Sequence, residues 1–182
     1  MRSTRPFYSI LLLLLFTFLT TSTIARADDE SDAEDYDVKA RVIRVSLLAG
    51  EVKLKRHDMP DWEHAKLNYP LVEGDTISTA GESRMEIQVD THNFIRVGPS
   101  SILRIVSLRD DALELSVVEG TVSVRLAKFD ADKESFEIDA PKTTQAAEKE
   151  GLYRIDVDKD GRVRLTARNG GRARFFSDRS GF

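Results

Sequence analysis

From Val42 onward, hydrophobic and polar residues alternate along most of the chain. The run MEIQVD places Met85, Ile87 and Val89 on alternate positions, with charged or polar residues between them. Successive side chains of a β-strand point to opposite faces, so this period of two is typical of strands with one buried face. Beyond the first 27 residues, only TTQAAEKEG offers a short helical spacing, and its neighbours favour strand. We therefore expect an all-β protein.

Turn-forming pairs separate the alternating runs. Asp160-Gly161 lies between two such runs and predicts a two-residue hairpin turn, because this turn needs positive φ, which Asp and Gly tolerate. Ala49-Gly50, Asn169-Gly170 and Glu119-Gly120, the last within ALELSVVEGTVSVRL, also predict hairpin turns, with less force. The chain is thus predicted to form a sandwich or β-roll of about a dozen short strands, rich in hairpins.

The first 27 residues have a composition of their own. Two arginines precede an apolar run from Phe7 to Leu19, and small residues then lead to the sequence ARA. This three-part pattern is typical of a secretory signal peptide, residues 1–27, with cleavage after Ala27. An uncleaved membrane anchor is the alternative, but the apolar run has 13 residues, whereas a spanning helix needs about 20. We expect a periplasmic or secreted protein with no stable membrane span after cleavage.

An acidic segment, DDESDAEDYD, follows at residues 28–37. Such a run repels itself and has little to bury, so we expect a disordered lead-in, with an acidic tail for a basic partner as the alternative. Residues 38–182 are then predicted to form one domain. The chain has no cysteine, which excludes disulfides and thiolate metal sites. Its net charge of −4 makes nucleic acid an unexpected partner.

Two short motifs raise the question of a metal. DVDKDG, from Asp156, matches the first half of a calcium loop, but the position of the final bidentate Glu is Ala167. A hairpin tip is the favoured interpretation, with weak surface calcium binding as the alternative. HDMPDWEH groups two histidines and two aspartates at a spacing that fits no familiar zinc motif, and a surface loop is favoured. We predict no metal and no cofactor.

The sequence offers no evident catalytic group. Ser100, Ser101 and Thr79 have no basic partner nearby in the sequence, and the acids are scattered along the polar faces of the predicted strands. A site assembled from distant residues stays open as an alternative. We expect a protein that is not an enzyme.

A basic stripe marks the C-terminal strands. Its arginines alternate with hydrophobic residues, and a solvated outer face, partly paired to nearby aspartates, is the favoured interpretation. The alternative is a docking surface for an anionic partner, with Trp62 as a stacking platform. The candidate interaction residues are Arg162, Arg164, Arg168, Arg172, Arg174 and Trp62.

Two stretches carry a resemblance to a known family. LVEGDTISTAGESRMEIQVD followed by FIRVGPSSILRI resembles the FecR-type domain of bacterial extracytoplasmic proteins, with its G-D-x-I-x-T motif at Gly74 to Thr79. LELSVVEGTVSV and the segment from Phe136 to Gly171 are similar to later parts of that domain, and the resemblance covers roughly Val42 to Phe176. It implies a β-rich domain outside the cytoplasm and supplies no catalytic residues.

The family's sigma-factor regulators carry a cytoplasmic segment and a membrane span before this domain. Here a predicted signal peptide takes their place, so the chain resembles the exported, free-standing form. We expect a non-enzymatic interaction or sensory module of the bacterial cell envelope that binds a protein partner through its β scaffold. The alternatives are a module that binds an anionic wall polymer or carbohydrate through the basic C-terminal strands, and a hydrolase built from distant residues.

Overall fold

The computed structural model describes residues 42–177, and every regular element in this range is a β-strand. The all-β prediction is confirmed. The predicted signal peptide, the acidic segment and the predicted domain start at Val38 lie outside the described residues. The strands in chain order are β1 (Ile43–Ala49), β2 (Val52–Lys55), β3 (Trp62–His64), β4 (Pro70–Leu71), β5 (Thr76–Thr79), β6 (Arg84–Gln88), β7 (Phe94–Val97), β8 (Ile102–Leu108), β9 (Ala112–Leu126), β10 (Ser135–Ala140), β11 (Thr143–Ala147), β12 (Gly151–Val157), β13 (Val163–Arg168) and β14 (Ala173–Ser177).

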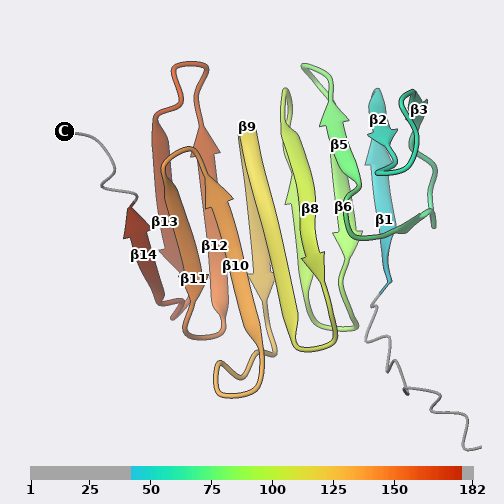
Figure 1. Ribbon diagram of the computed structural model, residues 1–182. Helices are drawn as coiled ribbons and strands as arrows, with labels where there is room; N and C mark the ends of the chain where they lie inside the picture. Colours follow the sequence, from blue (N-terminus) through green and yellow to red (C-terminus); the bar gives the residue numbers. More distant parts are fainter. Residues whose placement is uncertain (1–41, 178–182) are drawn as a thin grey trace, which may run out of the picture. The chain divides into compact units, whose positions relative to one another are not determined.

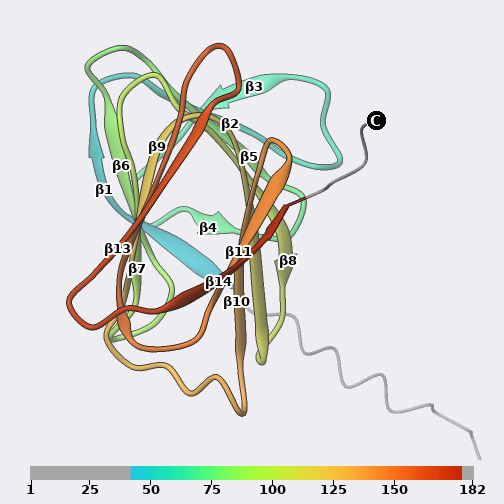
Figure 2. The same cartoon turned by 90° about the vertical axis from the view of Figure 1, so that its left-hand side faces the viewer.

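The strands form one curled sheet whose two halves lie face to face as layers (Figure 1, Figure 2). The front layer, which faces the viewer in Figure 1, has the strand order β3-β2-β5-β8-β9-β10-β11-β14. The back layer has the order β4-β1-β6-β7-β9-β12-β13. Neighbouring strands are antiparallel except β9 and β10, which run parallel.

Strand β9 is central in both layers. Its N-terminal half lies between β8 and β10, and its C-terminal half lies between β7 and β12. The predicted hairpin at Glu119-Gly120 is therefore wrong, because the chain continues through these residues as one bent strand. Gly120 has a φ of 92°, and a Cβ built there would lie 2.2 Å from Ser101 Oγ. The bend consequently requires glycine.

Two further glycine turns join the layers instead of closing hairpins. Ala49-Gly50 leads from β1 in the back layer to β2 in the front layer, and Asn169-Gly170 leads from β13 to β14 in the same sense. Asp160-Gly161 does close a hairpin, between β12 and β13. Its loop has three residues and not the predicted two, since Asp158 N–H donates to the Arg162 carbonyl at 3.0 Å.

The inward positions of both layers form one hydrophobic core. Alternation puts them there, as in β6, where Met85 and Ile87 are 1% and 0% exposed. Burying a side chain of this size contributes roughly 1.5–3 kcal/mol. The largest fully buried side chains, drawn from both layers, are Tyr153, Ile43, Leu54, Leu71, Ile77, Met85, Ile87, Ile95, Leu103, Ile105, Leu115 and Ile138.

Candidate functional site

The predicted basic stripe begins at Arg162, which lies in the hairpin between β12 and β13. Its guanidinium is 3.0 Å from Asp158 and 2.6 Å from Asp160. Asp158 Oδ1 also accepts hydrogen bonds from the N–H groups of Arg162 and Asp160, both at 2.9 Å. The backbone bond from Arg162 is the main cause that holds the pKa of Asp158 below its usual value. These contacts are those of a hairpin tip whose carboxylates are already engaged.

The remaining arginines of the stripe are divided between the layers. Arg164 and Arg168 lie on β13 at the end of the back layer. Arg172 precedes β14, and Arg174 lies on it, in the front layer. Both contact Glu148, at 2.9 and 2.7 Å. The structure thus brings Arg172 and Arg174 together around one carboxylate in the front layer, while Arg164 and Arg168 belong to the back layer.

Trp62 lies far from these arginines in the strand order. It begins β3, at the opposite end of the front layer from β14, and is 45% exposed. The histidine-containing segment around it holds His57 and His64, while His92 lies in the turn between β6 and β7 and contacts the Thr91 hydroxyl. Within residues 42–177, no three His, Asp or Glu side chains are grouped to hold a metal ion.

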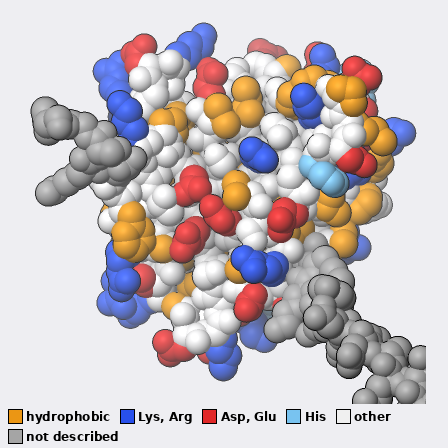
Figure 3. Space-filling view, viewed as in Figure 1, with side chains coloured by type: hydrophobic (Ala, Val, Ile, Leu, Met, Phe, Trp, Pro, Cys, Tyr) orange, Lys and Arg blue, Asp and Glu red, His pale blue; other side chains and the backbone are white. Residues whose placement is uncertain are grey.

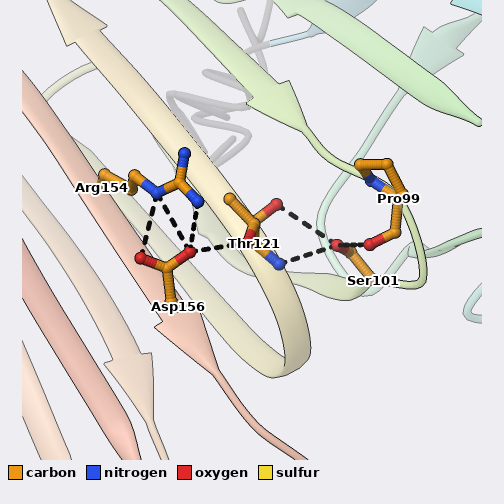
Figure 4. Close-up of polar contacts among 5 residues, drawn as sticks. All are labelled: Pro99, Ser101, Thr121, Arg154 and Asp156. Atoms are coloured by element: carbon orange, nitrogen blue, oxygen red, sulfur yellow. Dashed lines mark hydrogen bonds and ion pairs between the residues drawn. The ribbon is translucent and has the colours of Figure 1, made fainter.

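Two of the three hydroxyl groups considered as nucleophiles, those of Thr79 and Ser101, bind the backbone where the chain changes layer. Thr79 Oγ1 donates to the Gly98 carbonyl at 2.6 Å and accepts from Ser101 N–H at 3.0 Å. Ser101 Oγ donates to the Pro99 carbonyl at 3.0 Å and accepts from Thr121 N–H at 2.8 Å, as Figure 4 shows. These bonds satisfy backbone groups at the corners, so both hydroxyls have a structural role.

The G-D-x-I-x-T motif has a structural role as well. Asp75 is fully buried, and its Oδ2 accepts hydrogen bonds from Arg56 Nη1 at 2.6 Å and from Val72 N–H at 3.0 Å. Ile77 lies in the core, and Thr79 forms the corner bonds described above. Removing one partner of a buried ion pair costs about 3–5 kcal/mol. The motif therefore anchors the start of β5 to the loop after β2.

Acidic residues gather on the outer face of the front layer. The parallel pairing of β9 with β10 puts Glu114 directly beside Glu137, with Asp139 nearby; we call these three residues the acidic cluster. Figure 3 shows acidic side chains near the middle of this face. Burial, and then the hydrogen bond with Asp139, raise the pKa of Glu114. Sequence reasoning missed this cluster because it did not anticipate a parallel pair.

Arginines dominate the outer face of the back layer, which we call the arginine face. Its strand positions carry two acidic residues, Glu86 and Asp156. The pKa of Asp156 is lowered, mainly by its hydrogen bond with Arg154. The sequence pattern revealed only the part of this face on β13, because the strands are far apart along the chain. The arginines at its strand positions are Arg44, Arg84, Arg96, Arg125, Arg154, Arg164 and Arg168.

Strand β14 forms one end of the front layer. It pairs with β11 on one side, and no described strand pairs with its other side. Phe175 and Phe176, two of its five residues, are 52% and 50% exposed. An unpaired strand edge presents free N–H and C=O groups on which a further strand can form. Exposed aromatic side chains add hydrophobic area at the same place.

Comparisons with protein-family models, with curated proteins and with solved structures find no match to this chain. The resemblance to FecR-type domains therefore stays a prediction. The described residues also contain no helix with the length and apolar character needed to cross a membrane.

Proposed function

We propose that this protein is a non-enzymatic, extracytoplasmic interaction module that binds a protein partner by strand addition to β14. The observation that carries the proposal is the open edge of β14 together with the half-exposed side chains of Phe175 and Phe176. In strand addition, backbone hydrogen bonds supply affinity and alternate side chains supply specificity. The two phenylalanines offer contacts to side chains on both faces of an added strand.

The other ends of the two layers are less suited to this role. Strands β3 and β4 have three and two residues, and short edge strands give an added strand little to pair with. Strand β13 is longer, but it presents the charged side chains of Arg164 and Arg168. Charged residues on an edge disfavour pairing with another chain. Strand β14 has five residues and two exposed phenylalanines, and its one arginine, Arg174, is paired with Glu148 at 2.7 Å.

The test uses a photo-crosslinking residue in place of Phe176 in the full-length chain, expressed in bacterial cells. We expect crosslinks to one protein partner, and we expect the double substitution Phe175→Lys/Phe176→Lys to abolish its binding. Val118→Lys is the matched control, because Val118 is 52% exposed on β9, inside the sheet and away from the edge. Equal loss in the control, or an unchanged partner in the double variant, would refute binding at β14.

Export is tested separately. If the predicted signal peptide is cleaved after Ala27, N-terminal sequencing of the protein from the cell-envelope fraction should read DDESD. A protein that retains Met1 in a membrane pellet would contradict cleavage. That result would leave the β14 interaction open to its own test.

A further inference from the structure

The centre of the arginine face is a hollow of about 340 Å³. Small residues form its floor, with Gly98 between β7 and β8 and with Thr121 and Ser123 on β9. Longer side chains, including Arg84 and Arg96, surround it. The hollow thus arises where small and large side chains alternate across neighbouring strands. Its volume lies at the lower end of the range of small-molecule sites, roughly 300–1,000 Å³.

The register of the strands brings two arginines to opposite sides of the floor. Arg96 on β7 and Arg154 on β12 are each the direct neighbour of Ser123 on β9. Neighbouring strands are about 4.8 Å apart, so the two arginine backbones are separated by about 10 Å. Arg84 contributes a third guanidinium from β6. Three positive side chains therefore converge on one small space.

Acidic partners orient two of these guanidinium groups and leave N–H groups free. Arg154 donates to Asp156 through Nε at 3.0 Å and through Nη2 at 2.6 Å (Figure 4). Asp156 is itself held by the Thr121 hydroxyl, which donates to it at 2.7 Å. Arg96 donates to Glu86 through Nε at 2.8 Å. Guanidinium groups fixed in this way lose less conformational entropy when they bind an anion.

Arg84 completes the positive charge of the hollow. Its side chain has no ion pair or hydrogen bond within the described part of the chain, and the residue is exposed. Glu86 and Asp156 balance only two of the three guanidinium charges around the space. The hollow is consequently left with a net positive charge, which favours an anionic ligand.

A β-bulge adds an apolar wall. The pairing of β1 with β6 slips at Ser46, so Leu47 stands opposite Glu86 on the outer face instead of pointing into the core. Leu47 is 41% exposed and lines the hollow together with Pro99. The Ser46 hydroxyl donates to Glu86 Oε1 at 3.1 Å and so helps to hold the partner of Arg96. The bulge therefore supplies an apolar wall of the hollow and also helps to position Glu86 beside Arg96.

We infer that this hollow binds a small molecule of sugar size that carries an oxyanion, either a phosphate monoester or a carboxylate. The guanidinium N–H groups would bind the oxyanion, since planar guanidinium groups match both anions. Leu47 and Pro99 would contact the uncharged part of the molecule. This site lies on the outer face of the back layer, so it is separate from the proposed protein interaction at β14.

The test titrates the full-length protein with glucose 6-phosphate, glucuronate and uncharged glucose, using calorimetry and the NMR signals of arginine Nε–H groups. We expect saturable binding of at least one anionic sugar, no binding of glucose, and shifts at Arg84, Arg96 and Arg154. Preference for the phosphate or for the carboxylate identifies the source of the oxyanion. Absence of saturable binding by both anionic sugars would overturn the inference.

Matched variants separate the site from general attraction to a positive surface. Arg84→Gln/Arg154→Gln should weaken binding by about tenfold or more, since it removes charge-assisted hydrogen bonds. Arg125→Gln/Arg168→Gln removes the same charge from the same face outside the hollow and should have little effect. Ser123→Leu fills the hollow without a change in charge and should abolish binding. An equal loss in the Arg125/Arg168 variant, or unchanged binding in Ser123→Leu, would refute the site.

Discussion

The two outer faces of this molecule are built by the same strand alternation, but their charged side chains are grouped differently. The front layer presents the acidic cluster, where carboxyl groups lie beside one another, and the back layer presents the arginine face. The core between them is one continuous set of hydrophobic side chains. The comparison teaches that the inward positions determine the fold, while the outward positions are free to give each face its own chemistry.

The faces also differ in how their charges are compensated. On the arginine face, Arg96 and Arg154 have carboxylate partners at 2.8 and 2.6 Å. In the acidic cluster, Glu114 lies beside two like charges, and Arg109 opposes them only weakly in its effect on the pKa of Glu114. Like charges on neighbouring strands destabilise a sheet. Ion pairs thus hold the side chains of the arginine face in place, whereas the carboxyl groups of the acidic cluster repel one another.

The largest expected effect comes from breaking the core that both faces share. Leu115 is fully buried on β9, and Leu115→Asp should unfold the domain because an unpaired buried carboxylate costs several kcal/mol, comparable with a total stability of about 5–15 kcal/mol. Circular dichroism during thermal unfolding measures the loss. Val118→Asp, at an exposed position of the same strand, should unfold near the wild-type temperature. A cooperative, soluble Leu115→Asp variant would show that the faces are assigned wrongly.

The next effect concerns the bend that places one strand in both layers. Gly120→Ala should destabilise by more than about 1 kcal/mol, because positive φ is strained for alanine and the new Cβ would meet Ser101 and the Ser100 carbonyl. Gly170→Ala is the control: its φ is also positive, at 84°, but a Cβ there meets no atom within 4 Å. Chemical denaturation should therefore show a smaller loss for Gly170→Ala. Equal losses would mean that the close approach at the bend contributes nothing.

A smaller effect distinguishes the two faces by pH. The contributions of Glu114 on the front face and Asp156 on the back face to the free energy of unfolding should change with pH in opposite directions. The pKa of Glu114 is raised above its ordinary 4.5, so its folded form holds the proton longer, and the stability it contributes at low pH is lost as the pH rises above 4.5. The pKa of Asp156 is lowered from 3.8, so its contribution is present above 3.8 and is lost as the pH falls below that value.

Denaturation at a series of pH values measures both contributions. Glu114→Gln should remove the decline above pH 4.5, and Asp156→Asn should remove part of the decline below pH 3.8. Each change should stay below about 1 kcal/mol, because both side chains are partly exposed and screened by solvent. If neither variant changes how the free energy of unfolding depends on pH, the pH effects are not due to these two carboxyl groups.

The smallest effect is expected where the basic stripe was predicted from the sequence. Arg162→Ala removes two ion pairs in the hairpin between β12 and β13, but the Arg162 side chain is 78% exposed. Exposed pairs of this kind contribute about 0–1 kcal/mol, so the unfolding temperature should change little. A loss similar to that of Gly120→Ala would show that the hairpin, and not the bend, limits stability.

The sequence pattern predicted the strands and the buried positions well, because alternation is a local property. Met85, Ile87 and Val89 are buried as expected. It failed at Glu119-Gly120, where the residues that permit a hairpin equally permit a bend between layers. Local conformation is similar in the two cases, and only the distant partners β7, β8, β10 and β12 distinguish them.

The hollow could not be predicted from the sequence for the same physical reason, since it depends on which distant strands pair. Arg84, Arg96 and Arg154 belong to three strands, and no spacing along the chain reports that β7 and β12 both pair with the C-terminal half of β9. The basic stripe at residues 162–174 was visible because its members are neighbours in sequence. The structure divides them among a hairpin and two layers, so proximity in sequence was a poor guide to a shared surface.

Strand β9 has a consequence for how the domain forms and opens. Because each layer has one half of this strand at its centre, disruption of β9 removes backbone hydrogen bonds from both layers at once. Opening should therefore be cooperative, with the amide hydrogens of β9 exchanging with solvent only during global unfolding. The pairing of β9 with β7, which precedes it in the chain, and with β12, which follows it, also adds contacts between residues distant in sequence, and such contacts are typical of slow folding.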